Sequence, residues 1–164
     1  MHYFLGLEAW HSPEDIFLNQ GKYVIEILKR LYMMDCRAMS TPMEMNLNLL
    51  ADTSSEIVDV TLYRQMIGSL MYLTSTRPNI CFSVNTLSHY LVEPRHVHLV
   101  ATKHVMRYLK GTLDYGLYYT RDCDFRLYGY TDSDCSRRAS DRKSTSGCCF
   151  NLGSASMTSW KSRN

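Results

Sequence analysis

Residues 59–91 read DVTLYRQMIGSLMYLTSTRPNICFSVNTLSHYL, and the spacing of the apolar residues in this stretch decides the fold class. After Asp59, apolar residues recur at positions i, i+3, i+4 and i+7, which is typical of one face of an α-helix. The residues concerned are Tyr63, Met66, Ile67 and Leu70. Pro78 disfavours helical geometry in the residue before it, so this helix is predicted to end at Thr76–Arg77.

Three further helices are predicted around this one. Pro78 suits the first turn of the next helix, whose apolar face consists of Ile80, Val84, Leu87 and Leu91. The same spacing predicts a helix from Gly21 to near Met34 and another that ends at Gly111. Gly111 is expected to adopt the left-handed conformation that often ends helices. Residues 36–58 show no sustained period and are interpreted as a long connecting segment.

Strand patterns lie on both sides of the helices. Two short apolar runs, 2–8 and 16–19, are separated by a turn cluster and predict a β-hairpin. After the helices, a sheet is predicted to begin at Tyr115. Its strands are predicted at 115–120, 126–131, 147–152 and 157–160. Segregated helices and strands indicate an α+β fold.

The composition limits the class of protein. The chain has 164 residues, of which 45% are hydrophobic, so it can bury the core of one domain, or of one domain and part of another. No stretch approaches the ~20 apolar residues that cross a bilayer, and the first ten residues lack the basic start of a secretory signal. We therefore expect an intracellular chain with no membrane partner and six reduced cysteines. A net charge of +2 does not indicate nucleic acid by itself.

The string YTDSD at 130–134 holds the most pointed candidate for chemistry. On a strand, Asp132 and Asp134 share one face, and paired carboxylates suit a divalent metal ion. The alternative is a solvated strand end made of turn-forming residues. A two-metal nuclease site needs several more carboxylates, and Asp141 is the only acidic residue that follows. A complete metal site is therefore not predicted from these residues.

A second candidate is a group of basic residues that could follow a phosphate backbone. Lys103, Arg107 and Lys110 recur on the fourth helix, opposite its apolar face, and a polar loop downstream holds Arg137, Arg138, Arg142 and Lys143. The alternative is an ordinary solvated helix face, because cations are favoured near the C-terminal end of a helix. The residues alone leave both interpretations open.

Zinc and thiol chemistry are rejected. His96 and His98 are two residues apart and point to different sides of a helix, and His104 lies on the apolar face as a hydrogen-bonded core residue. Cys148 and Cys149 are adjacent in a predicted strand, so they face opposite ways. No cysteine has an identifiable base partner in the sequence.

Six strings in a fixed order resemble the Pol polyprotein of copia-type LTR retrotransposons. They are HYFLGLE at 2–8, KYVIEILKRLYMMDCRAMSTPM at 22–43, LYRQMIGSLMYLTSTRPNICFSVNTLS at 62–88, HVMRYLKGTLDYGLYY at 104–119, LYGYTDSD at 127–134, and DRKSTSGCCFNLGSA at 141–155 followed by SW. Any one string would be weak, but six in order over nearly the whole chain are specific.

The resemblance implies a division into three parts. Residues 1–19 would be the hairpin at the end of the reverse-transcriptase palm, near the element that grips the primer. Residues 20–114 would be a four-helix, thumb- and connection-like region. Residues 115–164 would be the first antiparallel strands of a truncated ribonuclease H-like sheet.

The resemblance also implies the roles of particular residues. Asp132 would be a metal ligand of the ribonuclease H site, which uses Mg²⁺ or Mn²⁺ in the parent enzyme, and Asp134 matches the family string without a defined role. The Tyr-x-Asp-Asp motif of the polymerase would lie upstream and the other ribonuclease H carboxylates downstream. The chain alone is therefore expected to bind no metal and to be inactive.

Three hypotheses follow. In the first, the chain is a fragment of a reverse transcriptase/ribonuclease H that positions an RNA/DNA hybrid or template–primer by backbone contacts. In the second, it is a non-catalytic module that binds nucleic acid or full-length Pol. In the third, it is the product of a pseudogene without a stable function.

Overall fold

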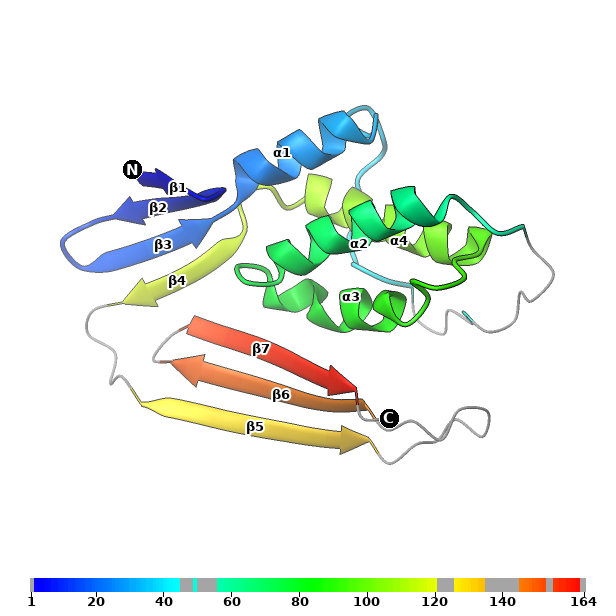
Figure 1. Ribbon diagram of the computed structural model, residues 1–164. Helices are drawn as coiled ribbons and strands as arrows, with labels where there is room; N and C mark the ends of the chain where they lie inside the picture. The colour runs from blue at the N-terminus through cyan, green and yellow to red at the C-terminus, as the bar shows by residue number, and fades with distance from the viewer. Residues whose placement is uncertain are drawn as a thin grey trace.

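The computed structural model describes residues 2–44, 49, 56–120, 126–134, 145–152 and 155–162 (Figure 1). The chain is an α+β protein, as the sequence predicts. Within those ranges three strands come first, four α-helices follow, and a fourth strand then completes a four-stranded antiparallel sheet with the first three. A separate three-stranded antiparallel sheet comes last. The three strands of the last sheet are described by their backbone pairing.

The first sheet has the order β1-β2-β3-β4. Its strands are β1 His2–Phe4, β2 Leu7–His11, β3 Asp15–Asn19 and β4 Gly116–Thr120. The predicted hairpin between 2–8 and 16–19 is present as β2 and β3, but the prediction of a single run over 2–8 is wrong. Leu5 and Gly6, with φ of 47° and 75°, turn the chain back between β1 and β2.

β4 belongs to this first sheet, so the prediction of one sheet that begins at Tyr115 is wrong. β4 pairs with β3 from Asn19↔Gly116 to Asp15↔Thr120. The second sheet has the order β5-β6-β7, with β5 Leu127–Asp134, β6 Thr145–Leu152 and β7 Ala155–Ser162. The residue types of a segment indicate a strand but not the strand with which it pairs. Here β3 precedes the four helices in the sequence and β4 follows them. The division into three parts stays a prediction.

The helices are α1 Gly21–Arg30, α2 Val60–Leu73, α3 Cys81–Ser88 and α4 His96–Lys110, with a 3₁₀ turn η1 at Pro78–Ile80 before α3. Asp59 caps α2 by accepting hydrogen bonds from the backbone N–H groups of Thr61 and Leu62 at 2.8 and 3.2 Å. α2 ends at Leu73, slightly before the predicted Thr76–Arg77.

The end of α1 and the backbone conformation at the end of α4 also differ from the predictions. α1 ends at Arg30 because Tyr32 takes a left-handed φ of 54°. The N–H groups of Tyr32 and Met33 then bind the carbonyls of Lys29 and Leu28, at 3.1 and 2.8 Å, which makes a Schellman motif. Gly111, by contrast, has φ −77° and ψ −7°, so the prediction of a left-handed residue there is wrong.

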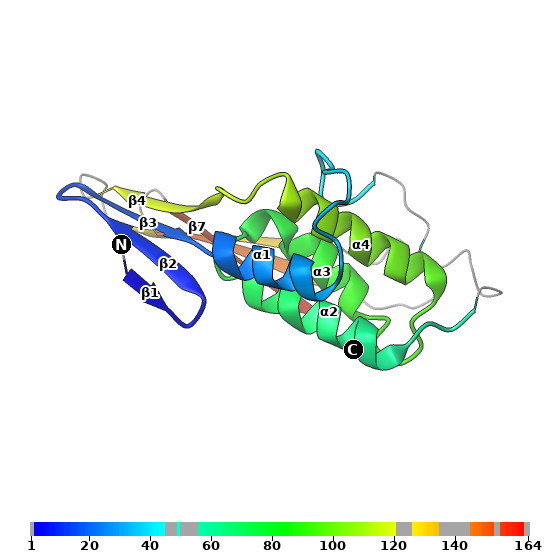
Figure 2. The same ribbon diagram turned by 90° about the horizontal axis from the view of Figure 1, so that it is seen from above.

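The core lies between the helices. The predicted apolar faces of α1 to α4 meet there, with Ile67, Leu70 and Leu87 fully buried. The first sheet extends beyond one end of this helical layer (Figure 2). In the second sheet, β7 runs beside α3 and β4. No helix in the described ranges is both long and apolar enough to cross a membrane.

Tyr63 gives the core a pH dependence. Its side chain is fully buried, its hydroxyl donates to the carbonyl of Leu87 at 2.8 Å, and burial raises its pKa from 10.0 to about 12. The stability that depends on this neutral hydroxyl is complete below pH 10 and is lost as the pH rises through about 12. We expect the free energy of unfolding to fall less over this window in Tyr63→Phe than in the unmodified chain. Tyr32→Phe, at a 97% exposed tyrosine, should change nothing; equal pH profiles for all three proteins would contradict the expectation.

Candidate nucleic-acid interface

The two aspartates of the YTDSD string lie in β5, which extends to Asp134, beyond its predicted end. In the strand register, Asp132 is opposite Gly147 and Asp134 is opposite Thr145. The two residues are therefore on the same face of the second sheet. Among the residues whose positions are described, no group of three or more His, Cys, Asp or Glu comes together as a metal site.

The basic residues of α4 differ in their surroundings. Lys103 is exposed, whereas Arg107 and Lys110 are half-buried. Nε of Arg107 donates to the carbonyl oxygen of Arg37 at 2.7 Å, and Nζ of Lys110 donates to the carbonyl oxygen of Cys36 at 2.5 Å. Both side chains thus hold the start of the connecting segment. Arg142 and Lys143 lie outside the described residues.

The hydrogen bonds of Arg107 and Lys110 are part of a longer series along α4. Nε2 of His104 lies 2.9 Å from the carbonyl oxygen of Thr41, and Nε2 of His98 lies 3.1 Å from that of Leu49. The partners therefore advance from residue 36 to residue 49 as the position on α4 falls from 110 to 98. The residues of the connecting segment that make these contacts thus follow α4 in the antiparallel direction. We call the part at 36–41 the strap. Arg107 and Lys110 therefore have partners within the chain, and their positions on α4 are explained without a ligand.

Two histidines of α4 are held by hydrogen bonds within the chain. His98 accepts a hydrogen bond from the backbone N–H of Arg95 at Nδ1, so its Nε2 carries the proton that is donated to Leu49. His104 is 9% exposed and hydrogen-bonded, which confirms its prediction as a core residue.

The turn between β1 and β2, which we call the hairpin tip, was missed by sequence reasoning. Phe4 and Leu5 are 72% and 70% exposed. A positive φ is a genuine outlier for a leucine, and such strain is found at binding and catalytic sites. The tip rests on α2, because the hydroxyl of Tyr72 donates to the carbonyl of Leu5. Gly6 between apolar residues was the available signal, since a glycine inside a strand pattern often marks a bend.

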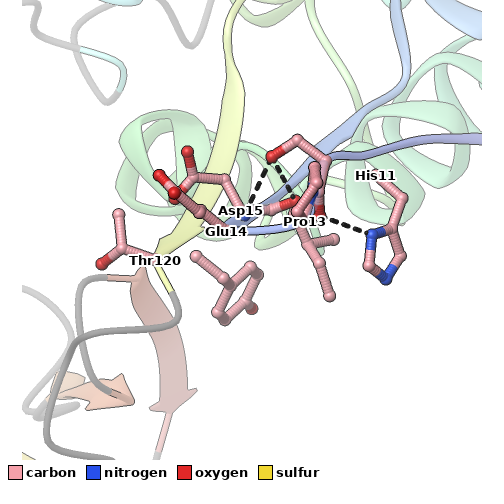
Figure 3. Close-up of a pocket in the computed structure, with 8 residues that line it drawn as sticks. His11, Pro13, Glu14, Asp15 and Thr120 are labelled. Atoms are coloured by element: carbon pink, nitrogen blue, oxygen red, sulfur yellow. Dashed lines mark hydrogen bonds between the residues drawn. The ribbon is translucent and has the colours of Figure 1, made fainter.

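A pocket of about 430 Å³ lies at the other end of this sheet, where β2 turns into β3 (Figure 3). Its lining residues are His11, Ser12, Pro13, Glu14, Asp15, Ile16, Tyr119 and Thr120. The Ser12 hydroxyl accepts from the backbone N–H of Asp15 at 3.0 Å and shapes the turn. The carboxylate of Asp15 accepts from the Tyr118 hydroxyl, and this hydrogen bond raises the pKa of Tyr118.

The charges around the pocket do not suit a phosphate. Glu14 and Asp15 contribute two carboxylates, and no described lysine or arginine lines the pocket. Like charges repel, so a nucleic-acid backbone would be disfavoured there. Of the three basic residues predicted on α4, Lys103 is the exposed one.

Comparison with known proteins identifies relatives over nearly the whole chain. An uncharacterized mitochondrial protein of Arabidopsis thaliana is 37% identical over 99% of this chain and 67% of its own length. The retrovirus-related Pol polyprotein from transposon RE2 of Arabidopsis thaliana is 37% identical over 99% of this chain and 11% of its own length. The corresponding polyprotein from transposon TNT 1-94 of Nicotiana tabacum is 33% identical over 93% of this chain and 12% of its own length.

The two transposon polyproteins define the class as retrotransposon Pol. The chain belongs to the retrovirus-related Pol family of copia-type retrotransposons. It spans about a tenth of the length of the two transposon polyproteins. No family model matches the chain, and no solved structure matches it.

Proposed function

We propose that the chain is the part of a reverse transcriptase/ribonuclease H in which the end of the polymerase palm, a helical thumb- and connection-like region and the first ribonuclease H strands follow one another. Its role would be to position an RNA/DNA hybrid or template–primer by contacts with the phosphate backbone. The observation that carries the proposal is the order of the units. An exposed hairpin tip comes first, a helical layer follows, and the sheet whose first strand holds Asp132 comes last.

The hairpin tip is the proposed contact near the primer. It presents exposed apolar side chains on a backbone turn that is fixed by the Tyr72 hydroxyl. A rigid, exposed turn of this kind positions a ligand better than a mobile one, because less conformational freedom is lost on binding.

Lys103 is the proposed phosphate contact of the helices. Its ammonium group is exposed on α4, whereas Arg107 and Lys110 already donate to the strap. Of the basic residues proposed as phosphate contacts, Lys103 is therefore the one described residue that stays, with Arg142 and Lys143 as further proposed contacts outside the described residues. An exposed cation contributes to hybrid binding by releasing counterions from the backbone.

Asp132 is the proposed remnant of a ribonuclease H metal site, with Asp134 beside it. Two carboxylates provide fewer ligands than a two-metal centre needs, so the residues present do not fit a complete site for Mg²⁺ or Mn²⁺. We derive no catalytic step through a metal, and we expect the chain alone not to cleave an RNA/DNA hybrid. Cleavage that Asp132→Asn abolishes would contradict this.

Lys103→Gln tests the proposal. We expect it to weaken binding of an RNA/DNA hybrid for any sequence and to reduce the salt slope of log K by about 1, because one phosphate contact is lost. The affinity is measured by fluorescence anisotropy with a labelled hybrid. Lys29→Gln is the matched control, because it removes the same charge from an exposed position on α1.

Equal losses in the two variants would mean that net charge alone drives binding. Unchanged affinity in both would remove α4 from the proposed interface. Binding of full-length Pol in place of the hybrid would favour a non-catalytic interaction module.

A further inference from the structure

One face of the first sheet carries a row of aromatic side chains across three strands. In the strand register, Trp10 of β2 is opposite Phe17 of β3, and Phe17 is opposite Tyr118 of β4. Residues that are opposite each other in a sheet point to the same face, and the ring centres of Phe17 and Tyr118 are 6.5 Å apart. Tyr3 of β1 is opposite Glu8, two residues before Trp10, and therefore belongs to the same face. We call Tyr3, Trp10, Phe17 and Tyr118 the aromatic face.

The aromatic face is open to solvent. Tyr3, Trp10 and Tyr118 are 51%, 50% and 49% exposed, and Phe17 is half-buried. Leu117, which points to the opposite face of β4, is 7% exposed. Contiguous exposed apolar patches mark interaction surfaces in soluble proteins, and aromatic residues are enriched in interfaces between proteins. This side of the first sheet therefore suits a partner that covers the aromatic rings.

The end of the aromatic face next to the helices carries an exposed positive charge. Nζ of Lys22 lies 5.3 Å from the centre of the Tyr3 ring and 3.7 Å from the carboxylate of Glu8. The side chain of Lys22 is 55% exposed, whereas that of Glu8 is 9% exposed. A partner would therefore meet the ammonium group of Lys22 at this end.

The other end of the aromatic face, at the turn between β2 and β3, is negative. Asp15 shares the face of Phe17 on β3, and its carboxylate accepts a hydrogen bond from the Tyr118 hydroxyl. Glu14 precedes it in the turn and is exposed. The hydrogen bond to Asp15 raises the pKa of Tyr118, and the negative charges of Asp15 and Glu14 add to this rise, so Glu14 acts on the same hydroxyl. The aromatic face thus runs from a cation at one end to two carboxylates at the other.

We propose that the aromatic face is the interface of a homodimer, in which two copies of this chain pack first sheet against first sheet. The two-fold axis lies in the interface, along the aromatic row, so the strand ends of one copy are reversed relative to those of the other. Lys22 of each copy then faces Glu14 of the second copy, and the two aromatic rows meet between these contacts. A two-fold interface must be self-complementary. An axis along the strands would instead place Lys22 against Lys22.

The homodimer goes beyond the proposed function and does not depend on hybrid binding. Its affinity would come from the aromatic rings, because each ring buries a large apolar area on association. Its orientation would come from the charged ends, because charges at the edge of an interface favour one register over others.

Sedimentation of the unmodified chain over a series of protein concentrations tests the homodimer first. We expect a reversible equilibrium between monomer and dimer. Trp10→Thr should weaken association by about tenfold or more, because buried aromatic anchors carry much of the binding energy of an interface. The matched control is Ile16→Thr, which truncates a 38% exposed side chain on the opposite face of the neighbouring strand. It should leave the equilibrium unchanged.

A chain that stays monomeric at every concentration, or equal losses in Trp10→Thr and Ile16→Thr, would overturn the homodimer. Nucleic acid is the other occupant that a row of aromatic rings could take, because bases stack on such rings. A monomeric chain whose tryptophan fluorescence is quenched by an oligonucleotide would assign the aromatic face to nucleic acid, and it would overturn the homodimer as well.

Charge reversal tests the orientation of the two copies. Lys22→Glu and Glu14→Lys each place like charges at both contacts of the dimer, so each variant alone should associate about tenfold or more weakly. A mixture of the two variants restores opposite charges at both contacts, so it should form a heterodimer with near the original affinity. Lys29→Glu, two turns further along α1, makes the same change of charge away from the aromatic face and should have little effect. A mixture that associates no better than the separate variants would overturn the proposed arrangement.

Discussion

Replacing Gly116 with alanine is expected to lower the free energy of unfolding by about 3 kcal/mol, because the new methyl group has no space. Its Cβ would lie 2.1 Å from the carbonyl oxygen of Leu18 and 2.9 Å from the Phe17 ring. The ring could move, but the carbonyl belongs to the strand with which Gly116 pairs. β3 and β4 must therefore separate, and the first sheet loses its fourth strand. Urea denaturation followed by circular dichroism measures the effect.

Gly68→Ala is the matched control for this substitution. Gly68 lies within α2, and a Cβ there meets nothing within 4 Å. Alanine is a better helix former than glycine, so the control should stabilise the chain by roughly 0.5–1 kcal/mol. If the two variants behaved alike, the close approach of β4 to β3 would be wrong.

Leu70→Ala is expected to cost about 3 kcal/mol, because it leaves a cavity between the helices. The Leu70 side chain is fully buried in the core cluster, which draws on all four helices. The loss should appear as a lower urea midpoint with an unchanged slope, since the surface exposed on unfolding stays about the same.

Met71→Ala provides the comparison on the same helix. Met71 follows Leu70 but is 50% exposed, so its truncation should cost less than about 1 kcal/mol. Equal costs at the two positions would mean that α2 turns a different face to the core.

The helices could be predicted because their apolar faces repeat within a single element. Tyr63, Ile67 and Leu70 follow the period of the helix and are all buried. The helix ends were less predictable, because they depend on single backbone conformations. Tyr32 ends α1 in a left-handed conformation that a tyrosine rarely takes, whereas Gly111 does not take it.

Sheet partners could not be predicted in the same way. The pattern of 115–120 identifies a strand, and the turn residues after it favour pairing with the next strand. The observed pairing with β3 brings backbones close together instead: a Cβ on Gly21 would lie 2.8 Å from the carbonyl oxygen of Leu113, and one on Gly116 would lie 2.1 Å from that of Leu18. Such a close approach is a property of the assembled fold.

The sequence could predict which residues of the candidate site lie on which element, but it could not predict what surrounds their side chains. Periodicity correctly placed Lys103, Arg107 and Lys110 on α4. It could not reveal that the carbonyls of the strap accept hydrogen bonds from two of them, because a segment without a period gives no indication of where it packs. Arg77 is 1% exposed, although a charged residue is ordinarily found at the surface. The positions of Asp132 and Asp134 in one strand agree with the pattern, and their role in metal binding stays a prediction.

The central claim is that the chain positions an RNA/DNA hybrid through its phosphate backbone. The most direct test is the affinity of the unmodified chain for a labelled hybrid, measured from about 50 mM to about 200 mM salt. The account predicts saturable binding whose log K falls linearly with log salt concentration, with little dependence on the hybrid's sequence. Binding that does not change with salt, or no saturable binding at the lowest salt, would contradict it.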